Sequence, residues 1–268
     1  LGDEIIEYNY SINQIEYGKD NTNLTFANLD KKTCDYLIIS DGVFSKGKSL
    51  ISENKFNAIY NASIAIRGNI SQKNFKDLDG KNISLFLGSN FHHVIYPVNK
   101  NGDLNFIAIM KYNLSNSEQK NYGLFNDDDF IKKVFKKIPQ ESRKFFDEVR
   151  EIKTFPVFVS NSYFKTKNNH IHFIGDAFFA FPPSFAQGAS QSIEGAYELF
   201  ENIKNNKENN FFKIRVNKTK MVNNRSKLNQ FAFHLSNPLN TFVRNIFLKR
   251  LVKNKKFLES YLGKIYKN

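Results

Sequence analysis

The sequence predicts a mixed α/β fold in which a sheet-rich insertion divides one α/β domain and helices form the C-terminal end. Short apolar runs separated by turn residues occupy residues 5–40 and 58–110, which indicates strands. Helical periodicity marks residues 127–150 and most of the chain after Gln187. A buried-type strand that ends at Gly175-Asp176 and leads into a helix links the two patterns, as is typical of α/β folds.

The first part of the chain predicts hairpins followed by a sheet. Residues 5–40 alternate apolar runs with polar turns and end in a buried strand at Tyr36–Ile39. Residues 58–110 contain further strand patterns, and Asn101-Gly102 predicts a hairpin turn before the last of them.

Helical patterns dominate the second part. Residues 127–150 predict two helices, and the acidic residues Asp127–Asp129 suit the first turn of a helix. The later elements are strands at 155–174, a helix from Gln187 to about Ile203, a polar linker at 204–210, and helices at 211–268 with a break at Asn237-Pro238.

Composition excludes several classes of protein. The 268 residues are 41% hydrophobic, which is enough for a core, and no apolar run reaches the roughly 18 residues that a membrane span needs. The single cysteine, Cys34, excludes an internal disulfide framework and favours a reducing, cytoplasmic compartment. The net charge of +13 is spread along the chain, so we expect no nucleic-acid partner.

The segment around Gly175-Asp176 is the strongest candidate for a ligand site. A strand, a tight turn and a helix start direct backbone N–H groups and the positive end of a helix dipole toward one place. Asp176 could there accept hydrogen bonds from ligand hydroxyl groups. The simpler interpretation is a strand–turn–helix connection in which Asp176 caps the turn, and this pattern alone leaves both open.

Four blocks of sequence, in order, lie within about residues 34–240. They are Cys34-Asp35-Tyr36-Leu37-Ile38-Ile39-Ser40-Asp41-Gly42-x2-Ser45, Gly88-x3-His92-x3-Tyr96-Pro97-Val98, Gly175-Asp176-Ala177-x5-Pro183-x2-Ala186-Gln187-Gly188-Ala189, and Arg225-Ser226 with Phe233-His234-Leu235-Ser236-x-Pro238-Leu239. Together they resemble the FAD-dependent aromatic-ring monooxygenases, and most closely the salicylate hydroxylase-like branch of the p-hydroxybenzoate hydroxylase fold.

The resemblance implies an FAD-binding Rossmann-like domain interrupted by a substrate domain. The implied parts are residues 1–57 as a partial FAD-binding domain, 58–160 as a substrate-binding domain with a mixed sheet, 161–203 as the FAD-binding domain with the second flavin motif, and 204–268 as a C-terminal helical region. The sequence contains no G-x-G-x-x-G, the unit with which such proteins hold the FAD pyrophosphate. We therefore expect that an N-terminal piece is missing and that the chain is inactive by itself.

The implied activity is hydroxylation of a small aromatic substrate. NAD(P)H would reduce FAD, O2 would form a flavin hydroperoxide, and one oxygen atom would enter the ring. His92, with a pKa near neutrality, would deprotonate a phenol, and Tyr96 would hydrogen-bond a substrate oxygen, although either side chain could be structural and His93 is an adjacent candidate. The residues implied in FAD binding are Asp41, Gly42, Gly175, Asp176, Pro183, Gln187, Gly188 and Ala189.

Two positions depart from the resemblance. Phe179 stands where relatives often have His, and Gly195 stands where they often have Asp. With Phe178 and Phe181, Phe179 makes the loop before the flavin motif apolar. These departures favour a larger or more apolar substrate, or a relative that binds a ligand without catalysis.

Other interpretations remain open at this stage. Gly42–Ser49 fits G-x-x-x-x-G-K-[ST], which predicts a P-loop nucleotide hydrolase with Lys48 on the phosphates. A membrane-associated quinone-pathway hydroxylase of the same fold is a further alternative. The basic amphipathic stretch Phe242–Tyr266 predicts either a helix on an anionic membrane surface or a docked terminal helix. His170 and His172 have no nearby third ligand, so we expect no metal site.

Overall fold

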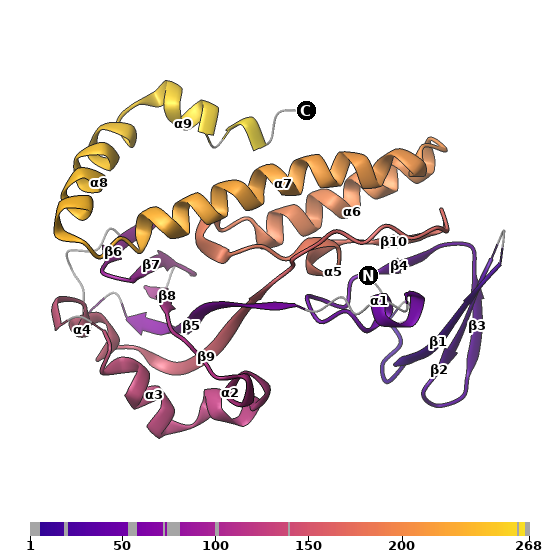
Figure 1. Ribbon diagram of the computed structural model, residues 1–268, viewed down its shortest axis with the longest axis horizontal. Coiled ribbons are helices and arrows are strands. Elements are labelled where there is room, and N and C mark those ends of the chain that lie inside the picture. The colour runs from indigo at the N-terminus through magenta and orange to yellow at the C-terminus, as the bar shows by residue number, and fades with distance from the viewer. Residues whose placement is uncertain are drawn as a thin grey trace. The chain divides into compact units, whose positions relative to one another are not determined.

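Two compact units make up the chain. The first comprises Leu1–Ile59 and Phe158–Asn223, and the second comprises Tyr60–Val157 and Asn224–Asn268. Strand β9 (Arg150–Val159) and helix α7 (Glu208–Phe233) each continue from one unit into the other. The structure, a computed structural model (Figure 1), describes residues 6–18, 21–52, 58–71, 73, 81–99, 102–138, 140–261 and 263–265, without the side chain of Glu141.

The first unit combines an antiparallel sheet with a parallel pair of strands. In the antiparallel sheet, β2 (Thr22–Phe26) lies between β1 (Ile12–Tyr17) and β3 (Lys31–Cys34). In the parallel pair, β4 (Leu37–Ile39) lies beside β10 (Ile171–Phe173). The helical elements of this unit are α1 (Lys46–Ile51), α5 (Gly175–Phe179), the 3-10 turn η4 (Pro183–Phe185), α6 (Gly188–Lys204) and the first part of α7.

The parallel pair lies within the hydrophobic core of the first unit. Leu37 and Ile39 point into the core while Ile38 between them is exposed, as the two-residue period of a strand requires. Phe173 of β10 is buried in the same core. Since the backbone N–H of Ile174 still donates to the carbonyl of Ile39 at 3.0 Å, both strands end at the same edge.

The second unit contains a five-stranded sheet with the order β6-β7-β8-β5-β9. The expected hairpin is confirmed by the antiparallel pairing of β7 and β8, and its turn residue Asn101 lies outside the described residues. The remaining elements are β5 (Ile59–Ser71), β6 (Ser84–Gly88), β7 (Phe91–Pro97), β8 (Asp103–Lys111), α2 (Asn116–Lys120), η3 (Tyr122–Asn126), α3 (Asp128–Phe135), α4 (Gln140–Phe146), α8 (Pro238–Leu251), α9 (Lys255–Tyr261) and η5 (Gly263–Ile265).

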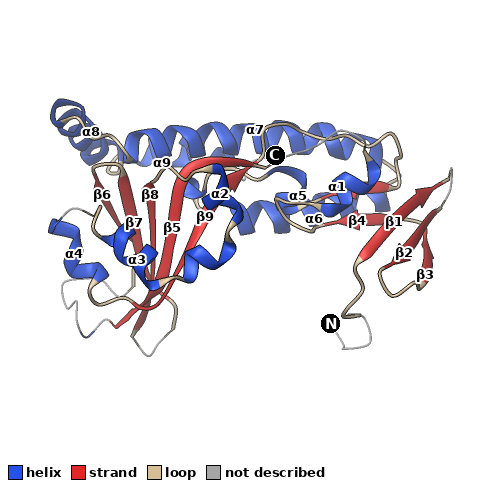
Figure 2. Ribbon diagram, turned by 60° about the horizontal axis from the view of Figure 1, so that its bottom comes forward, coloured by secondary structure: helices blue, strands red, loops and turns tan. Residues whose placement is uncertain are grey.

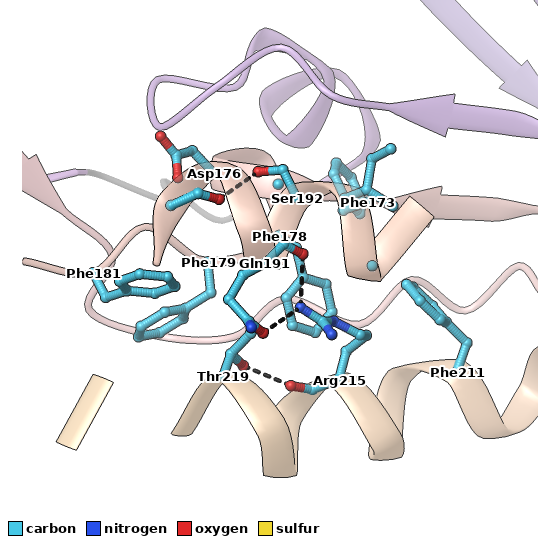
Figure 3. A pocket seen from close by; sticks show the side chains of 14 residues that line it. Phe173, Asp176, Phe178, Phe179, Phe181, Gln191, Ser192, Phe211, Arg215 and Thr219 are labelled. Atoms are coloured by element: carbon cyan, nitrogen blue, oxygen red, sulfur yellow. Dashed lines mark hydrogen bonds between the residues drawn. The ribbon is translucent and has the colours of Figure 1, made fainter. Parts of the chain in front are cut away.

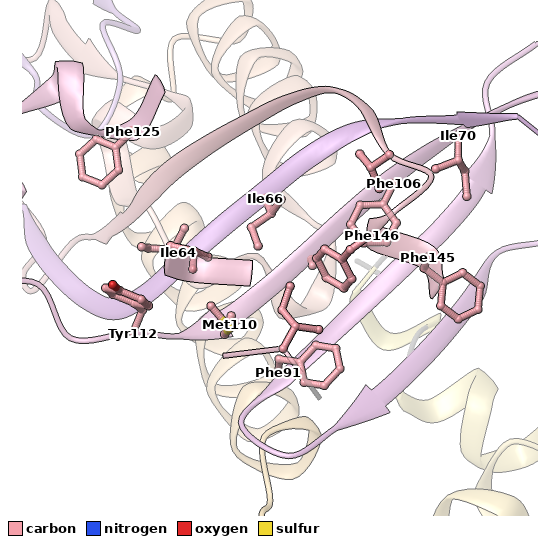
Figure 4. Close-up of a cluster of buried hydrophobic side chains, with 14 of the residues drawn as sticks. Ile64, Ile66, Ile70, Phe91, Phe106, Met110, Tyr112, Phe125, Phe145 and Phe146 are labelled. Atoms are coloured by element: carbon pink, nitrogen blue, oxygen red, sulfur yellow. The ribbon is translucent and has the colours of Figure 1, made fainter. Parts of the chain in front are cut away.

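One face of this sheet forms the hydrophobic core of the second unit. Alternate strand residues such as Ile64, Phe91 and Phe106 point to this face and are almost fully buried (Figure 4). Helices α3 and α4 cover the same face (Figure 2), and their Val134 and Phe146 complete the core.

His93 belongs to this core and His92 to the opposite face, because neighbouring residues of a strand point to opposite sides. The His93 ring is fully buried and stacks on Phe86 with 4.6 Å between the ring centroids. Neither of its ring nitrogens has a hydrogen-bond partner among the described residues. Burial lowers the pKa of His93 to about 4.

The helical second half follows the sequence closely. The expected helical stretch at 127–150 divides into α3 and α4 and ends where β9 begins. The expected break at Asn237-Pro238 is confirmed, since Asn237 caps α8 by accepting from the N–H groups of Leu239 and Asn240. Among the described residues, no helix has both the length and the apolar character needed to cross a bilayer.

We predict that His93 makes the protein sensitive to acid. Because the folded-state pKa lies below the ordinary 6.5, the unfolded chain binds the proton more readily, and stability falls as the pH is lowered from 6.5 toward 4. His93→Leu should remove up to roughly 3 kcal/mol of that loss. Urea unfolding at neutral and mildly acidic pH measures it, and an acid loss equal to that of the wild type would contradict the assignment.

Candidate functional site

Two carboxylate residues follow the ends of the two parallel strands. Asp41 comes two residues after β4, and Asp176 comes three residues after β10. In open α/β sheets, ligands bind at the carboxyl ends of parallel strands. The parallel pairing thus brings two segments that are distant in sequence to one edge of the first unit.

Asp41 organises the turn that follows β4. Its Oδ2 accepts a hydrogen bond of 2.8 Å from the backbone N–H of Gly47, in the first turn of α1. Gly47 must be glycine here, because a Cβ atom would lie 2.7 Å from Cγ2 of Ile39. Gly42 has a φ of +83°, which suits the same turn. A groove of about 340 Å³ lies beside this turn, with Asp41 and Ile38 among its lining residues.

The P-loop interpretation of Gly42–Ser49 does not agree with this geometry. A phosphate-binding lysine must reach a ligand, yet Lys48 is buried, its Nζ lies 5.8 Å from the ring centroid of Phe173, and burial lowers its pKa. Ser45 is used as the N-cap of α1, where its hydroxyl accepts from the N–H of Lys48. Asp41 and this capped turn account for the segment without a phosphate loop.

Asp176 lies in the first turn of α5, directly after a glycine with a left-handed backbone. Gly175 has a φ of +59°, and a Cβ atom there would lie 3.0 Å from Oγ of Ser192 on α6. Glycine therefore allows the turn to contact α6 closely. The Asp176 carboxylate reaches the surface, pointing away from the buried side chains below it (Figure 3), and partial desolvation raises its pKa.

The N-terminus of α6 is open. The side chain of its N-cap residue, Gln187, does not accept a hydrogen bond from the N–H groups of the first turn, as a capping side chain would. Gly188 and Ala189 are exposed, and a Cβ atom at Gly188 would meet nothing within 4 Å. Pro183 of η4 is also exposed. The helix end therefore presents backbone donors and a positive dipole end to the surface, where an anionic or electron-rich group could bind.

A buried polar network holds α6 beneath this surface. Arg215 of α7 donates from Nη2 to the backbone carbonyl and Oε1 of Gln191, at 2.9 and 3.0 Å (Figure 3). It also donates from Nη1 to Glu198 at 3.0 Å. Gly195 makes room for this guanidinium, because a Cβ atom there would lie 3.3 Å from Nε. The departure at Gly195 thus has a packing cause. The remaining cavity of about 10 Å³ holds one water molecule at most, so a larger ligand must bind on the outer surface.

The apolar segment that the sequence predicted as a loop begins as helix α5, and its aromatic side chains are used for packing. Phe178 and Phe179 are buried, and Phe179 stacks on Tyr163 with 4.3 Å between the ring centroids. Both rings belong to the core of the first unit, so their apolar character has a packing cause, and a preference for a larger or more apolar substrate stays a prediction.

The second unit contains the two residues implied in catalysis. His92 and Tyr96 are four residues apart on β7 and point to the face opposite the hydrophobic core. His92 is buried with 3% exposure, its Nδ1 lies 2.9 Å from Nε2 of His234, and its ring contacts Phe233 edge-on. Tyr96 is half-buried.

The histidine pair is neutral. Burial lowers the pKa of His92 to about 3 and that of His234 to about 4. His234 also hydrogen-bonds the backbone carbonyl of Ile109, which can only accept. Neutral His234 has one ring proton, which it donates to the Ile109 carbonyl. Its Nε2 therefore accepts from Nδ1–H of His92, and Nε2 of His92 is left as an acceptor. The expected near-neutral pKa of His92 is wrong, because the sequence does not reveal this burial.

Sequence reasoning missed several of these groups. Arg215 and Gln191 carry no motif, and only the helical spacing of Gln191, Gly195 and Glu198 hints at one shared face. His234 lies in a resemblance block, which was a usable signal, but its pairing with His92 needs the fold.

No family model matches the chain, and no curated protein matches it. Solved structures do. HpxO of Klebsiella pneumoniae, crystallised with FAD and uric acid, has a TM-score of 0.80 at 13% identity, over 99% of this chain and 68% of that chain. A salicylate hydroxylase substrate complex has a TM-score of 0.68 at 17% identity, over 90% of this chain and 66% of that chain. The 2,6-dihydroxypyridine-3-hydroxylase of Arthrobacter nicotinovorans has a TM-score of 0.67 at 13% identity, over 85% of this chain and 64% of that chain.

These similarities define the fold. The chain has the fold of FAD-binding monooxygenases and spans about two thirds of the length of these proteins, so the expected fold class and the expected resemblance are confirmed at the level of fold. At this identity the comparison establishes architecture, while the chemistry of the site rests on the residues described above.

We predict that Arg215 stabilises the first unit chiefly by neutralising Glu198. Arg215→Met should lower the free energy of unfolding by roughly 3 kcal/mol, because it leaves a partly buried carboxylate uncompensated. The double variant Arg215→Met/Glu198→Gln should recover part of that loss in urea unfolding. Lys132→Met, at the exposed Lys132–Asp129 pair, is the control and should change the free energy of unfolding by under about 0.5 kcal/mol. Equal stability of the single and double variants would count against this role.

Proposed function

We propose that the protein is a flavin-dependent monooxygenase that hydroxylates a small aromatic ring. The observation that carries this proposal is the edge where β4 and β10 end, with Asp41, Asp176 and the open N-terminus of α6 following these strands. The fold of the FAD-binding monooxygenases supports it.

The residues present fit FAD. The Asp176 carboxylate suits the hydroxyl donors of a ribityl chain, since charge-assisted hydrogen bonds are strong. The N–H groups of Gly188 and Ala189 suit the pyrimidine edge of the isoalloxazine, which carries negative charge when reduced. The lack of a side chain at Gly188 and the exposed Pro183 leave space for the flat ring.

Bound FAD would supply the redox chemistry, taking electrons from NAD(P)H and using O2 to deliver one oxygen atom to the ring. The sequence itself holds no Gly-rich pyrophosphate-binding unit. We therefore expect residues 1–268 alone to bind FAD more weakly than a protein that also supplies such a unit.

His92 would act on the substrate as a hydrogen-bond acceptor. His234 fixes its tautomer, so Nε2 of His92 can accept from a phenolic or similar N–H or O–H group. With a pKa of about 3, His92 is a weak base in this environment, and it would orient the substrate more than remove its proton. Tyr96 on the same strand face would provide a second polar contact.

One observation favours a membrane-associated quinone-pathway hydroxylase as a second candidate. Helix α8 exposes several large apolar side chains, which would suit a protein that takes an apolar substrate from a lipid surface. Hydroxylation of a long-chain phenol that depends on added vesicles would distinguish it from an enzyme acting on small soluble aromatics.

We predict that Asp176 contributes directly to FAD affinity. Asp176→Asn keeps the shape of the side chain and removes its charge, so the Kd for FAD should rise about tenfold. Quenching of flavin fluorescence on titration measures the Kd. Asp35→Asn is the matched control, because this exposed carboxylate lies at the other end of β4. A Kd unchanged in Asp176→Asn, or raised equally in Asp35→Asn, would reject the role.

We predict that His92 affects turnover and not flavin binding. His92→Gln should lower product formation about 100-fold, because a misplaced substrate reacts slowly, without changing the Kd for FAD. His234→Gln should give a smaller loss, since it acts only through the orientation of His92. NAD(P)H oxidation and hydroxylated product, measured over a panel of small phenols and purines, provide the test. His93→Leu is the control in the neighbouring core, and a loss equal to that of His92→Gln would refute the assignment.

A further inference from the structure

Within the part of the chain that the structure describes, helix α8 packs on the rest of the second unit through the face that carries Arg244. Arg244 is buried on that face, and its Nη1 donates to the carbonyls of Ala232 and Phe233, the last turn of α7, at 3.4 and 3.2 Å. Leu248 and Leu251 are half-buried on the same side. These bonds satisfy carbonyl groups that the end of a helix leaves without partners, and they fix which side of α8 faces outward.

The outward face of α8 is apolar. Its large side chains follow the spacing i, i+3, i+4, i+7 and i+8, which places them in one stripe along the helix. They are exposed by between 41% and 70%. The apolar stripe consists of Leu239, Phe242, Val243, Ile246 and Phe247. A helix docked by its apolar face would present polar residues here, so the expectation of an ordinary docked terminal helix does not describe α8.

A cationic cluster follows the apolar stripe along the chain. Its members are exposed and lie in the last turn of α8, the following turn and the start of α9. The cationic cluster consists of Lys249, Arg250, Lys253, Lys255 and Lys256. The sequence has no Asp or Glu between Glu208 and Glu259, so Glu259 of α9 is the one acidic residue of residues 209–268 beside five cations. Figure 1 shows α8 and α9 in gold and yellow, consecutive at the C-terminal end of the chain.

The charge distribution identifies the partner. An apolar stripe beside a dense cationic cluster is the pattern of helices that lie in the surface of an anionic bilayer. A second copy of the chain would cover the stripe but would bring only another α8 without acidic residues to face the cationic cluster. We propose that α8 binds the surface of membranes rich in anionic phospholipids, with the apolar stripe inserted among the acyl chains and the cationic cluster on the headgroups.

A fluorescence experiment tests the insertion. The chain contains no tryptophan, so Phe247→Trp introduces a single probe within the apolar stripe. Mixed phosphatidylcholine–phosphatidylserine vesicles should shift its emission to the blue, and brominated acyl chains should quench it. Tyr122→Trp is the matched control, since Tyr122 in η3 is an exposed aromatic residue of the same unit. Its emission should not change. No shift in Phe247→Trp, or an equal shift in both variants, would overturn the proposal.

Co-sedimentation with the same vesicles separates the two contributions. Phe242→Ser/Phe247→Ser should reduce binding at least about tenfold, because it removes the inserted area. Lys249→Gln/Arg250→Gln should reduce binding to anionic vesicles, as should added salt, and phosphatidylcholine alone should bind poorly. Unchanged binding of the serine variant would overturn the proposal. So would a wild-type dimer in light scattering that the serine variant dissociates, because the apolar stripe would then be a self-association face.

Discussion

The parallel pairing of β4 with β10 is the constraint on which the candidate site depends. It is short, since only three residues of each strand pair before the N–H of Ile174 bonds the carbonyl of Ile39. Because the two strands run in parallel, two segments that are remote in sequence end at the same edge of the sheet. The glycines then follow from geometry: Gly47 lets α1 lie on β4, and Gly175 lets the turn after β10 contact α6.

The position of the α6 N-terminus depends on the hydrogen bonds between α6 and α7. Arg215 binds both the backbone and the side chain of Gln191 and also Glu198, so α6 is fixed to α7 by hydrogen bonds at a buried contact. Because the helix is held rigidly, its first-turn N–H groups keep their direction, and no reorganisation is needed when a ligand binds. In the second unit, the hydrogen bond that His92 donates to His234 plays a similar part by fixing the tautomer of His92.

The sequence predicted the order of the elements, the strand–turn–helix around Asp176 and the break before Pro238, because each rests on local periodicity and turn chemistry. It misjudged features set by burial. His92 was expected to titrate near neutrality and is buried beside His234, and Lys48, a phosphate ligand only in the alternative P-loop interpretation, is buried against Phe173. The outward direction of the apolar face of α8 was also out of reach, since both sides of this helix carry apolar residues.

The central claim is that the edge formed by β4, β10 and α6 holds the flavin. A crystal structure of the protein with FAD tests it most directly. We expect the ribityl hydroxyl groups within hydrogen-bond distance of Asp176, and the pyrimidine edge of the isoalloxazine at the N–H groups of Gly188 and Ala189. Electron density for the flavin elsewhere, or a ring turned away from the N-terminus of α6, would contradict the account.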